Sequence, residues 1–559
     1  MNMRKRVMAV GVTLCLWIVM GSMNHAKATE RIPSHDRAVV QTDVGPVKGN
    51  VLKGYRLFQG IPYAAAPAGE LRWQSPQPVK AWTNLFDATK PGNLCPQESA
   101  IYSGVASLTE DCLNLNVTVP NSLDNKKLKP VMVWLHGGGG FNGAGSLYNA
   151  RRSAVDGDVM VVTINFRLGI FSGFAYDGLQ GSGTFGLQDQ QAALQWVKRN
   201  AAAFGGDPNN VTLFGESIGA VSVAAHLVSP AAKGLFHRAA IQSGFPLMDV
   251  PTGTLYPNVP FLFPSLAWMT KEEGKVMGSQ AATDLGCNDP KTALLCMRKL
   301  PVKALLAKSP QFTRFEFGNN VLPEDPVQAL RGGRFHRVPV INGGTRDEAR
   351  LFVALFFDLA GQPVTERAYP DMLKKAFGAA ADKIEVEYSL DDYATPSIAW
   401  ASVVTDRLWS LRTMQLNEYF AKHVPTYAYE FADRNAPAVT PFPEGFPPGA
   451  FHSSELAYQF DIADTAINFS KAQRQLAKQM NRYWANFAHS GNPNDEHSPR
   501  WKKFDTNAVI PFVLSLAPGE GGIGPVNYSD EHRLDFWRSI KADDRVAMLN
   551  ILNKELVHM

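Results

Sequence analysis

A serine, an acidic residue and a histidine, which together can hydrolyse esters, occur along this chain in the order in which many serine hydrolases carry them. The serine is Ser217, within Gly215-Glu216-Ser217-Ile218-Gly219. The apolar residues 211–214 before it predict a strand, and the alanine-rich stretch from Ala220 predicts a helix. Gly-x-Ser-x-Gly between a strand and a helix holds the serine hydroxyl above a sheet and predicts a nucleophile. The alternative is an ordinary serine in a glycine-rich turn.

The predicted nucleophile needs a base and an acid. A histidine takes the proton of the serine, and a carboxylate holds the histidine ring in the required tautomer. His452 lies in a loop after a predicted strand, whereas the other late histidines lie in or beside helices, in a polar loop or at the C-terminus. Asp347 and Glu348 follow the apolar residues 338–342, at a strand end where ligand chemistry gathers in α/β sheets. Spacing alone does not separate Asp347 from Glu348.

A glycine-rich loop follows another predicted strand. The continuous apolar run at residues 131–135 predicts a strand buried on both faces, and it ends in His136-Gly137-Gly138-Gly139-Gly140. Loops of this kind complete the oxyanion hole of α/β-hydrolases, because glycines let backbone N–H groups approach the substrate. A flexible linker is the alternative, but linkers rarely follow a core strand directly.

A second glycine motif, Gly-x-Gly-x-x-Gly at residues 181–186, does not predict a dinucleotide site. Its glycines do not directly follow a buried strand, and Asp207, at the distance of a ribose-binding acid, lies in a Gly-Gly-Asp-Pro turn. We interpret it as a loop before a helix at residues 188–203. We expect no cofactor and no metal, since Cys-x-x-Cys spacing is absent.

The elements around these motifs predict the fold class. Strands and helices alternate along the chain, which predicts an α/β fold with a mostly parallel sheet and helices on both faces. Looser helical patterns predict cap insertions around residues 245–330 and 350–420. The apolar run at 351–359 fits a pocket or cap helix and ordinary core about equally well.

The N-terminus has the pattern of an export signal. Basic residues 4–6 precede an apolar run at 7–20, which is too short for a comfortable membrane span, and Ala26-Lys27-Ala28 offers a cleavage site. We expect residues 1–28 to be removed and residues 29–559 to form one domain, secreted or periplasmic. A retained anchor is the alternative.

Charge and cysteine content narrow the partners and the compartment. The chain has 55 basic and 51 acidic residues, and residues 1–28 hold four of the basic ones, so the remainder is neutral overall. Nothing in this balance predicts nucleic-acid binding or electrostatic membrane docking. Beyond the leader, the four cysteines fall into two close pairs, Cys95 with Cys112 and Cys287 with Cys296, which predicts two disulfides. Buried thiols or a metal site are the alternatives.

These residues stand in blocks that resemble the type B carboxylesterases, a family that includes secreted carboxylesterases, cholinesterases and some lipases. The resemblance implies the α/β-hydrolase fold, with Ser217 as nucleophile, Glu348 as acid and His452 as base. It places oxyanion donors on the N–H groups of Gly138, Gly139 and Ile218, and it supports both cysteine pairs. The matching blocks are residues 58–64, 110–116, 136–139, 206–217, 347–348 and 451–452.

Three residues depart from the pattern of that family. Gly140 stands where an aromatic residue is usual, Ile218 replaces a small alanine, and Ala349 replaces a glycine. None of these changes removes a catalytic atom, but they alter the expected pocket. Residues 95–112 also contain no tryptophan and only Tyr102 as an aromatic residue, which argues against a cholinesterase that stacks a quaternary ammonium.

The sequence therefore predicts a serine carboxylesterase that hydrolyses a small-molecule ester through an acyl-enzyme. A lipase or an aromatic-ester hydrolase of the same family is an alternative within enzymes. A non-catalytic binding member of the fold is the alternative outside them, although all three triad positions carry usable side chains. The natural ester, the oligomeric state and the choice between periplasm and medium stay open.

Overall fold

A sheet of eleven strands organises the residues that the computed structural model describes, which are 37–99, 105–121, 127–257, 265–462, 465 and 467–540. From β17 to β9 neighbouring strands run parallel, and antiparallel pairs extend the sheet at both edges. In spatial order the strands are β18 (Ile523–Val526), β17 (Val513–Leu516), β15 (Thr426–Phe431), β14 (Val340–Thr345), β11 (Arg238–Gln242), β10 (Gly206–Glu216), β7 (Lys129–Leu135), β9 (Met160–Ile164), β6 (Asn114–Pro120), β4 (Tyr55–Pro62) and β3 (Asn50–Leu52).

The central strands are buried on both faces because successive side chains enter two different cores. In β7, Val133 packs into one core and Trp134 into the other. In β11, Ile241 and Ala240 divide in the same way. A strand buried on both faces reads as a continuous apolar run, which is why the sequence predicted these strands.

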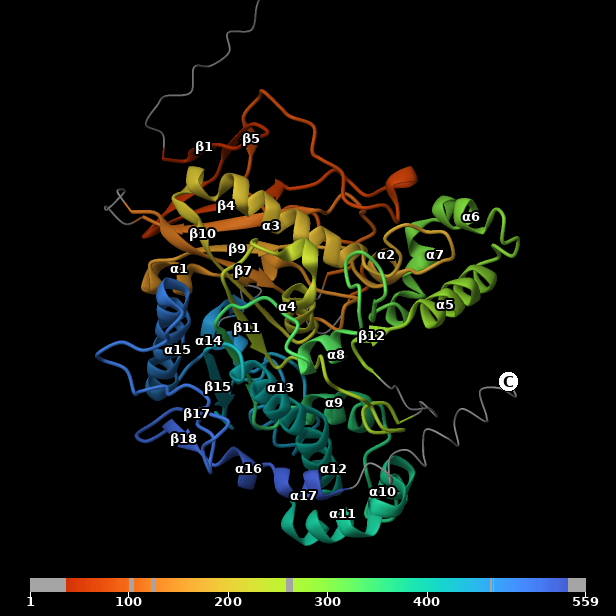
Figure 1. Ribbon diagram of the computed structural model, residues 1–559, viewed down its shortest axis with the longest axis vertical. Coiled ribbons are helices and arrows are strands. Elements are labelled where there is room, and N and C mark those ends of the chain that lie inside the picture. The colour runs from red at the N-terminus through yellow and green to blue at the C-terminus, as the bar shows by residue number, and fades with distance from the viewer. Residues whose placement is uncertain are drawn as a thin grey trace, which may run out of the picture. The chain divides into compact units, whose positions relative to one another are not determined.

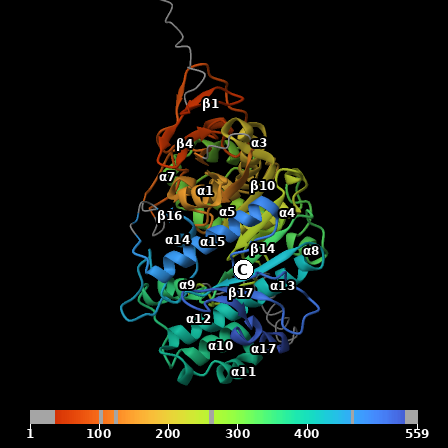
Figure 2. The ribbon, with the colours of Figure 1, turned by 90° about the vertical axis from the view of Figure 1, so that its left-hand side faces the viewer.

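Helices cover each face of the sheet. On one face lie α3 (Phe185–Phe204), α4 (Ile218–Val228) and α13 (Leu411–Ala421), and on the other lie α1 (Arg151–Gly157) and α15 (Lys471–Ser490) (Figures 1 and 2). This arrangement confirms the predicted fold class, an α/β protein with a mostly parallel sheet and helices on both faces.

Two long excursions leave the sheet. The first follows β11 and packs α5, α6 and α7 on α2 (Gly169–Gly173) around a separate apolar core. The second, between β14 and β15, contains two π-helical segments. The excursion after β11 holds β12 (Trp268–Met269), α5 (Lys271–Asp284), α6 (Ala293–Lys299), α7 (Val302–Leu306), β13 (Phe315–Glu316) and α8 (Pro326–Arg331). The excursion between β14 and β15 holds α9 (Ala349–Val353), the π-helical Ala354–Asp358, α10 (Tyr369–Phe377), α11 (Ala381–Glu387), α12 (Pro396–Val404), the π-helical Thr405–Ser410 and α13.

Smaller elements complete the described chain. A three-stranded sheet precedes the main one, and a short antiparallel pair joins β8 to β16. Their bounds are β1 (Val39–Gln41), β2 (Pro46–Lys48), β5 (Phe86–Asp87), β8 (Tyr148–Asn149), α14 (Leu456–Gln459), β16 (Asp461–Ile462), α16 (Tyr528–Glu531) and α17 (Leu534–Ser539).

β14 differs from its predicted bounds in a way that matters for the site. The apolar run at 338–342 predicted a strand that ends there, but the strand pairs with β15 as far as Thr345. Gly343 and Gly344 resemble a loop in sequence, yet both lie in the strand. A side chain at Gly343 would meet the carbonyl oxygen of Tyr429 at 2.2 Å, so only glycine fits between these neighbours. Because β14 continues to Thr345, the loop with Asp347 and Glu348 begins at the carboxyl end of a strand that lies between β11 and β15.

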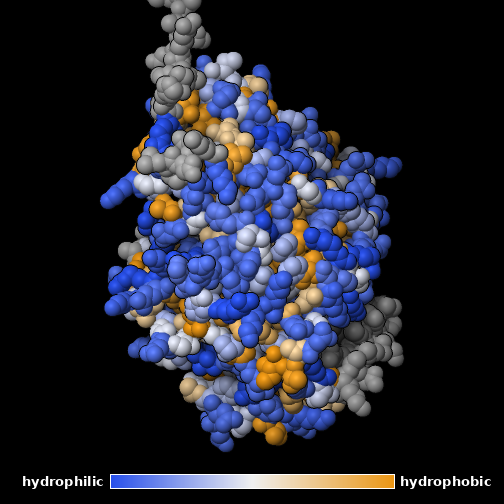
Figure 3. Space-filling model, turned by 60° about the vertical axis from the view of Figure 1, so that its left-hand side comes forward, coloured by the Kyte–Doolittle hydropathy of each residue, from blue (hydrophilic) through white to orange (hydrophobic). Residues whose placement is uncertain are grey.

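The predicted export signal and its cleavage site at Ala28 lie outside the described residues, as does Tyr102. Among the residues the structure does describe, no helix has both the length and the apolar character needed to cross a membrane. The face in Figure 3 is mainly hydrophilic with scattered apolar groups, as is usual at a protein surface.

Candidate active site

Ser217 lies on the sharp turn between β10 and α4. Its backbone adopts φ 57° and ψ −126°, a strained conformation for a residue with a side chain. The turn is tight enough that a side chain at Gly215 would meet the backbone of Gly219 at 2.7 Å, and one at Gly219 would meet the carbonyl oxygen of Leu135 at 2.1 Å. The two glycines of the motif are therefore required by close backbone packing, and together they hold Ser217 at the end of a central strand.

Glu348 and His452 form a short hydrogen bond. Nδ1 of His452 lies 2.5 Å from Oε2 of Glu348, and the backbone N–H of Thr345 donates to Oε1 of Glu348 at 2.8 Å. His452 and Glu348 are almost fully buried, at 4% and 1% exposed. The end of β14 therefore fixes the carboxylate, and the carboxylate fixes the orientation of the imidazole ring.

Asp347, the other acid candidate, is engaged elsewhere. Its carboxylate pairs with Arg434 at 2.9 Å and with Arg350 at 3.1 Å, and it accepts a hydrogen bond from the N–H of Ala450 at 2.9 Å. These contacts tie the acidic loop to the segment before His452. The structure thus separates two neighbours that the sequence could not: Glu348 contacts the histidine, and Asp347 braces the loop.

The second ring nitrogen of His452 faces the elbow. Nε2 lies 3.1 Å from Oε1 of Glu216, the residue directly before Ser217. Within the described part of the chain Nε2 has no hydrogen-bond partner, so the bond between Ser217 and His452 is not formed in this conformation. Catalytic hydrogen bonds are often unformed in unliganded sites and tighten when substrate binds.

Aromatic rings surround the imidazole of His452. The ring centroid of Phe352 lies 5.0 Å from it and that of Trp409 lies 6.0 Å from it, and these two rings stack on each other at 5.1 Å. Trp409 belongs to the π-helical segment Thr405–Ser410, and such segments frequently occur at functional sites. The apolar run at 351–359 serves both predicted roles, because Phe352 borders His452 whereas Phe357 lies in the core.

Three buried glutamates gather around His452: Glu216, Glu348 and Glu455. Burial, and after it the charge of Glu348, raises the pKa of Glu216 well above its usual range. Burial, and after it the charges of Glu216 and Glu348, raises the pKa of Glu455 to about 8. Burial thus favours the protonated form of both groups, which reduces the negative charge around the imidazole.

Glu455 was assigned no role from the sequence. It is fully buried, and neither of its carboxylate oxygens has a hydrogen-bond partner among the described residues. Its position three residues after His452 is the one signal in the sequence that could have indicated it.

The glycine-rich loop after β7 lies against the elbow. A side chain at Gly137 would meet Oε2 of Glu216 at 2.3 Å and Cβ of Ser217 at 3.1 Å. The N–H groups of Gly138 and Gly139 donate to no other described residue, and the N–H of Ile218 is the first of α4, where the helix offers no acceptor. Three backbone donors without partners therefore belong to the two segments that meet at Ser217.

Two departures from the family pattern lie side by side. A side chain at Gly140 would stand 3.5 Å from Cγ1 of Ile218 and 3.5 Å from Cβ of Thr313. The bulk of Ile218 therefore borders the space that a side chain at position 140 would enter. The third departure is Ala349, which directly follows Glu348 and whose N–H donates to Oγ1 of Thr405 at 3.0 Å.

Both cysteine pairs form disulfides. The sulfur atoms are 1.96 Å apart in Cys95–Cys112 and 2.01 Å apart in Cys287–Cys296. The first disulfide lies near the glycine-rich loop after β7, since Gln97, two residues after Cys95, bonds to Gly143. The second joins Cys287, in the connection between α5 and α6, to Cys296 in α6.

The second glycine motif packs against the excursion that follows β11. A side chain at Gly183 would meet Cβ of Glu316 at 2.3 Å, so protein already fills the space beside this loop. The loop leads into α3, as predicted. Among the described residues, no group of three or more His, Cys, Asp or Glu side chains is arranged to hold a metal ion.

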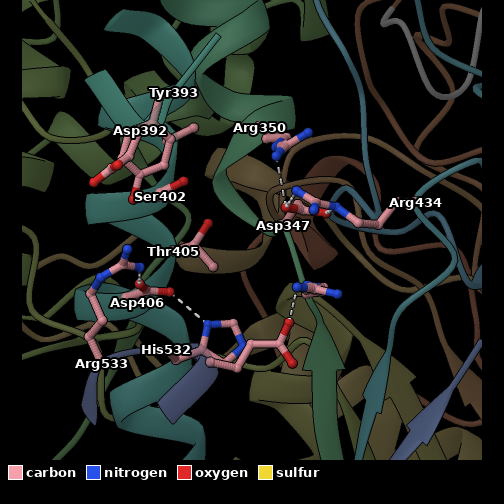
Figure 4. A pocket seen from close by; sticks show the side chains of 13 residues that line it. Asp347, Arg350, Asp392, Tyr393, Ser402, Thr405, Asp406, Arg434, His532 and Arg533 are labelled. Atoms are coloured by element: carbon pink, nitrogen blue, oxygen red, sulfur yellow. Dashed lines mark hydrogen bonds and ion pairs between the residues drawn. The ribbon is translucent and has the colours of Figure 1, made fainter. Parts of the chain in front are cut away.

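A polar pocket of about 200 Å³ adjoins the acidic loop (Figure 4). Asp347 and Arg350, on either side of Glu348 in sequence, line it. Below them in Figure 4, Nδ1 of His532 lies 2.6 Å from Asp406. On the other side of the ring, Nε2 of His532 lies 2.5 Å from Glu430, so His532 bridges two carboxylates. The guanidinium and carboxylate groups of the pocket wall largely pair with one another, which makes this region a brace behind Glu348.

The parallel sheet, the strained serine and the Glu348–His452 pair define an α/β-hydrolase with a serine-type site. The sequence model described as "Carboxylesterase family" matches residues 36–518. The chain belongs to the carboxylesterase family, and it is a carboxylic ester hydrolase.

Relatives and solved structures agree with this assignment. Para-nitrobenzyl esterase of Bacillus subtilis (strain 168) is 34% identical over 85% of this chain and 94% of that protein. Cocaine esterase of Homo sapiens is 30% identical over 96% of each chain. A solved thermophilic PNB esterase superposes with a TM-score of 0.73 at 29% identity, over 90% of this chain and 100% of that one.

Proposed function

We propose that Ser217, His452 and Glu348 carry out ester hydrolysis in two steps. His452 Nε2 takes the proton of Ser217, whose oxygen attacks the ester carbonyl carbon. The tetrahedral oxyanion accepts hydrogen bonds from the N–H groups of Gly138, Gly139 and Ile218. The protonated ring then gives its proton to the departing alcohol, leaving an acyl-enzyme. Water, deprotonated by His452, attacks this acyl-enzyme and releases the acid and Ser217.

The bond between Glu348 and His452, beside the elbow that carries Ser217, is the observation that supports this proposal most directly. Glu348 holds the ring so that Nδ1 is the protonated nitrogen, which leaves Nε2 as the acceptor. Nε2 has no hydrogen-bond partner among the described residues, so nothing in that part of the chain needs to be displaced before it can accept a proton.

Two buried serines have to be distinguished by the test. Ser243, at the end of β11, also has a strained backbone at φ 49°, and its hydroxyl has no partner among the described residues. We expect Ser217→Ala to lower kcat for p-nitrophenyl butyrate about 10⁵–10⁶-fold. Ser243→Ala should stay within a few-fold of the parent. A fluorophosphonate probe, located by peptide mass spectrometry, should label Ser217, and labelling of Ser243 instead would refute the assignment.

A narrower proposal concerns the substrate. The partly exposed ring of Phe352, backed by the buried ring of Trp409, offers an apolar surface beside His452 on which an aromatic part of the ester can pack. Benzyl acetate should therefore be preferred over cyclohexylmethyl acetate in kcat/KM. Phe352→Leu should reduce that preference while changing both rates through its contact with His452. An unchanged ratio would remove Phe352 from substrate recognition.

We also propose that residues 29–559 act as one exported hydrolase domain, with the excursions around 245–330 and 350–420 forming its cap. The two disulfides are compatible with an oxidising compartment. Intact-mass analysis of the protein recovered from cell fractions should give a chain that begins at Thr29. A full-length chain in the cytoplasm would overturn this proposal.

A further inference from the structure

We propose that Gln97 is a positioning residue for ester hydrolysis, because its side-chain amide fastens the glycine-rich oxyanion loop to the loop closed by Cys95–Cys112. This inference rests on the proposed function, since it assumes that the N–H groups of Gly138 and Gly139 receive the oxyanion.

The amide of Gln97 holds Gly143, at the far end of the loop, by both of its backbone groups. The N–H of Gly143 donates to Oε1 of Gln97 at 2.9 Å, and Nε2 of Gln97 donates to the carbonyl oxygen of Gly143 at 3.0 Å. Gln97 is fully buried, so water does not compete for these bonds. Two bonds in opposite directions fix both the position and the orientation of the Gly143 backbone.

The other side of Gly143 is closed by a histidine ring. A side chain at Gly143 would meet Nδ1 of His136 at 2.5 Å, and His136 stacks on Phe166 with ring centroids 4.4 Å apart. Burial lowers the pKa of His136 to about 4, so its ring is neutral in the working range. Gly143 is therefore held between a buried, uncharged and stacked ring and the amide of Gln97.

The loop between these anchors needs outside support. Gly138, Gly139 and Gly140 all have positive φ, at 99°, 63° and 81°, and glycines can leave such conformations without a steric penalty. Inside the loop, the backbone bonds from Phe141 and Asn142 to the carbonyl oxygen of Gly138 are long, at 3.3 and 3.2 Å. The N–H of Gly169 donates to the carbonyl oxygen of Gly140 in the middle of the loop at 2.6 Å, while β7 fixes one end of the loop and Gln97 fixes the other.

Gln97 is itself held by the disulfide loop. Its backbone exchanges two hydrogen bonds with Ser107, at 3.0 and 2.9 Å, and its Nε2 also donates to the carbonyl oxygen of Cys95 at 3.1 Å. Cys95 is joined to Cys112, which lies two residues before β6 of the central sheet. A continuous set of bonds therefore runs from the sheet through the disulfide and Gln97 to the loop that carries the proposed oxyanion donors.

The expected effect of losing this anchor is on the transition state rather than on substrate binding. Removing an oxyanion donor lowers kcat about 10²–10³-fold, and a donor that is only displaced should lose part of that. Gln97→Met keeps the volume of the side chain but has neither amide group. We expect kcat to fall about 10–100-fold, KM to change less than about three-fold, and affinity for a trifluoromethyl ketone to fall in proportion to kcat/KM.

A second variant makes the test independent of folding defects in the first. Gln97→Glu keeps an acceptor for the Gly143 N–H, but its carboxylate would face the carbonyl oxygens of Gly143 and Cys95. Protonation restores a donor, so kcat relative to wild type should recover as the pH is lowered. A role in packing alone predicts a ratio that does not depend on pH.

The matched control is Gln191→Met. Gln191 is a buried amide on helix α3 that donates to Oγ of Ser229 at 3.0 Å, and no hydrogen bond among the described residues joins either of them to Gln97 or Gly143. It should keep wild-type kcat and inhibitor affinity. Wild-type kcat and ketone affinity in folded Gln97→Met, or a pH-independent ratio in Gln97→Glu, would overturn the inference. Ser217→Ala assayed in parallel separates the two claims, because an active Ser217→Ala enzyme would refute the proposed function itself.

Discussion

Nε2 of His452 lies 3.1 Å from Oε1 of Glu216, while Nδ1 of the same ring is bonded to Glu348. The imidazole therefore sits between two carboxyl groups of different character. The pKa of Glu216 is raised by burial and by the charge of Glu348, which favours a neutral carboxyl group beside the nitrogen that must accept the serine proton. A second ionised carboxylate there would oppose proton return by holding the imidazolium too strongly.

This asymmetry predicts different outcomes for two equivalent substitutions. Glu348→Gln should lower kcat about 10³–10⁴-fold at pH 7, because an amide neither stabilises the imidazolium nor enforces the tautomer. Glu216→Gln should lower kcat less than about ten-fold, since an amide resembles a protonated carboxyl group in charge and shape. Steady-state kinetics on p-nitrophenyl butyrate measure both. Equal losses would show that Glu216 works as an anion.

Glu455 should make the folded protein less stable as the pH rises. Its pKa is raised to about 8 by burial and by neighbouring carboxylates, from 4.5 for the ordinary side chain. Between these values the folded state binds a proton that the unfolded state releases, so the free energy of unfolding falls with increasing pH, by at most about 1.4 kcal/mol per unit.

Glu455→Gln removes that dependence. The melting temperature of Glu455→Gln relative to wild type should therefore be higher at pH 8 than at pH 5. Glu496→Gln, at an exposed position, is the control and should show no such trend. A difference that stays constant across this range would contradict the prediction.

His532 should stabilise the fold most strongly in acid and neutral solution. Burial alone would lower its pKa, but the charges of Glu430 and Asp406 and their hydrogen bonds raise it to about 10, from 6.5. A raised histidine pKa gives stability that is complete below pH 6.5 and disappears as the pH rises through 10. His532→Gln should cost about 3–5 kcal/mol at pH 6, because two buried carboxylates lose their cation. Urea unfolding should show this deficit shrinking by pH 9.5, and a deficit that grew would disprove the ion-pair account.

Ile218 should restrict the acyl or alcohol group that the site accepts. Its side chain is 3% exposed and borders the position of Gly140, while its N–H is a backbone group that any residue supplies. Ile218→Ala should raise the ratio of kcat/KM for p-nitrophenyl hexanoate over acetate, because it opens space beside Ser217. The cavity should also cost about 2–4 kcal/mol of stability. For Ile218→Val, which removes less volume, this ratio should lie between those of wild type and Ile218→Ala. A ratio that does not follow side-chain volume would exclude a steric role for Ile218.

The sequence predicted best where chemistry and local backbone geometry coincide. The elbow at Ser217 could be predicted because the glycines, the strand and the helix lie within one short segment. Asp347 and Glu348 could not be separated, because the difference between them depends on Arg434 and Ala450 from a distant segment.

Long-range contacts also explain what the sequence did not reveal. Gln97 gains its significance from Gly143, which lies 46 residues further along the chain. The continuation of β14 to Thr345 depends on pairing with β15 rather than on its own residues, two of which are glycines. Interpretation of a single sequence identifies the reacting groups more readily than the residues that hold them.

The order β10, β11, β14, β15 in the sheet has a consequence for biosynthesis. These neighbouring strands deliver Ser217, Glu348 and His452 from segments that leave the ribosome at widely separated times. A nascent polypeptide would therefore be inert towards esters until almost its entire length had emerged and the last of these segments had docked. The order of the strands therefore makes esterase activity a property of the assembled sheet, which a partly synthesised chain does not yet have.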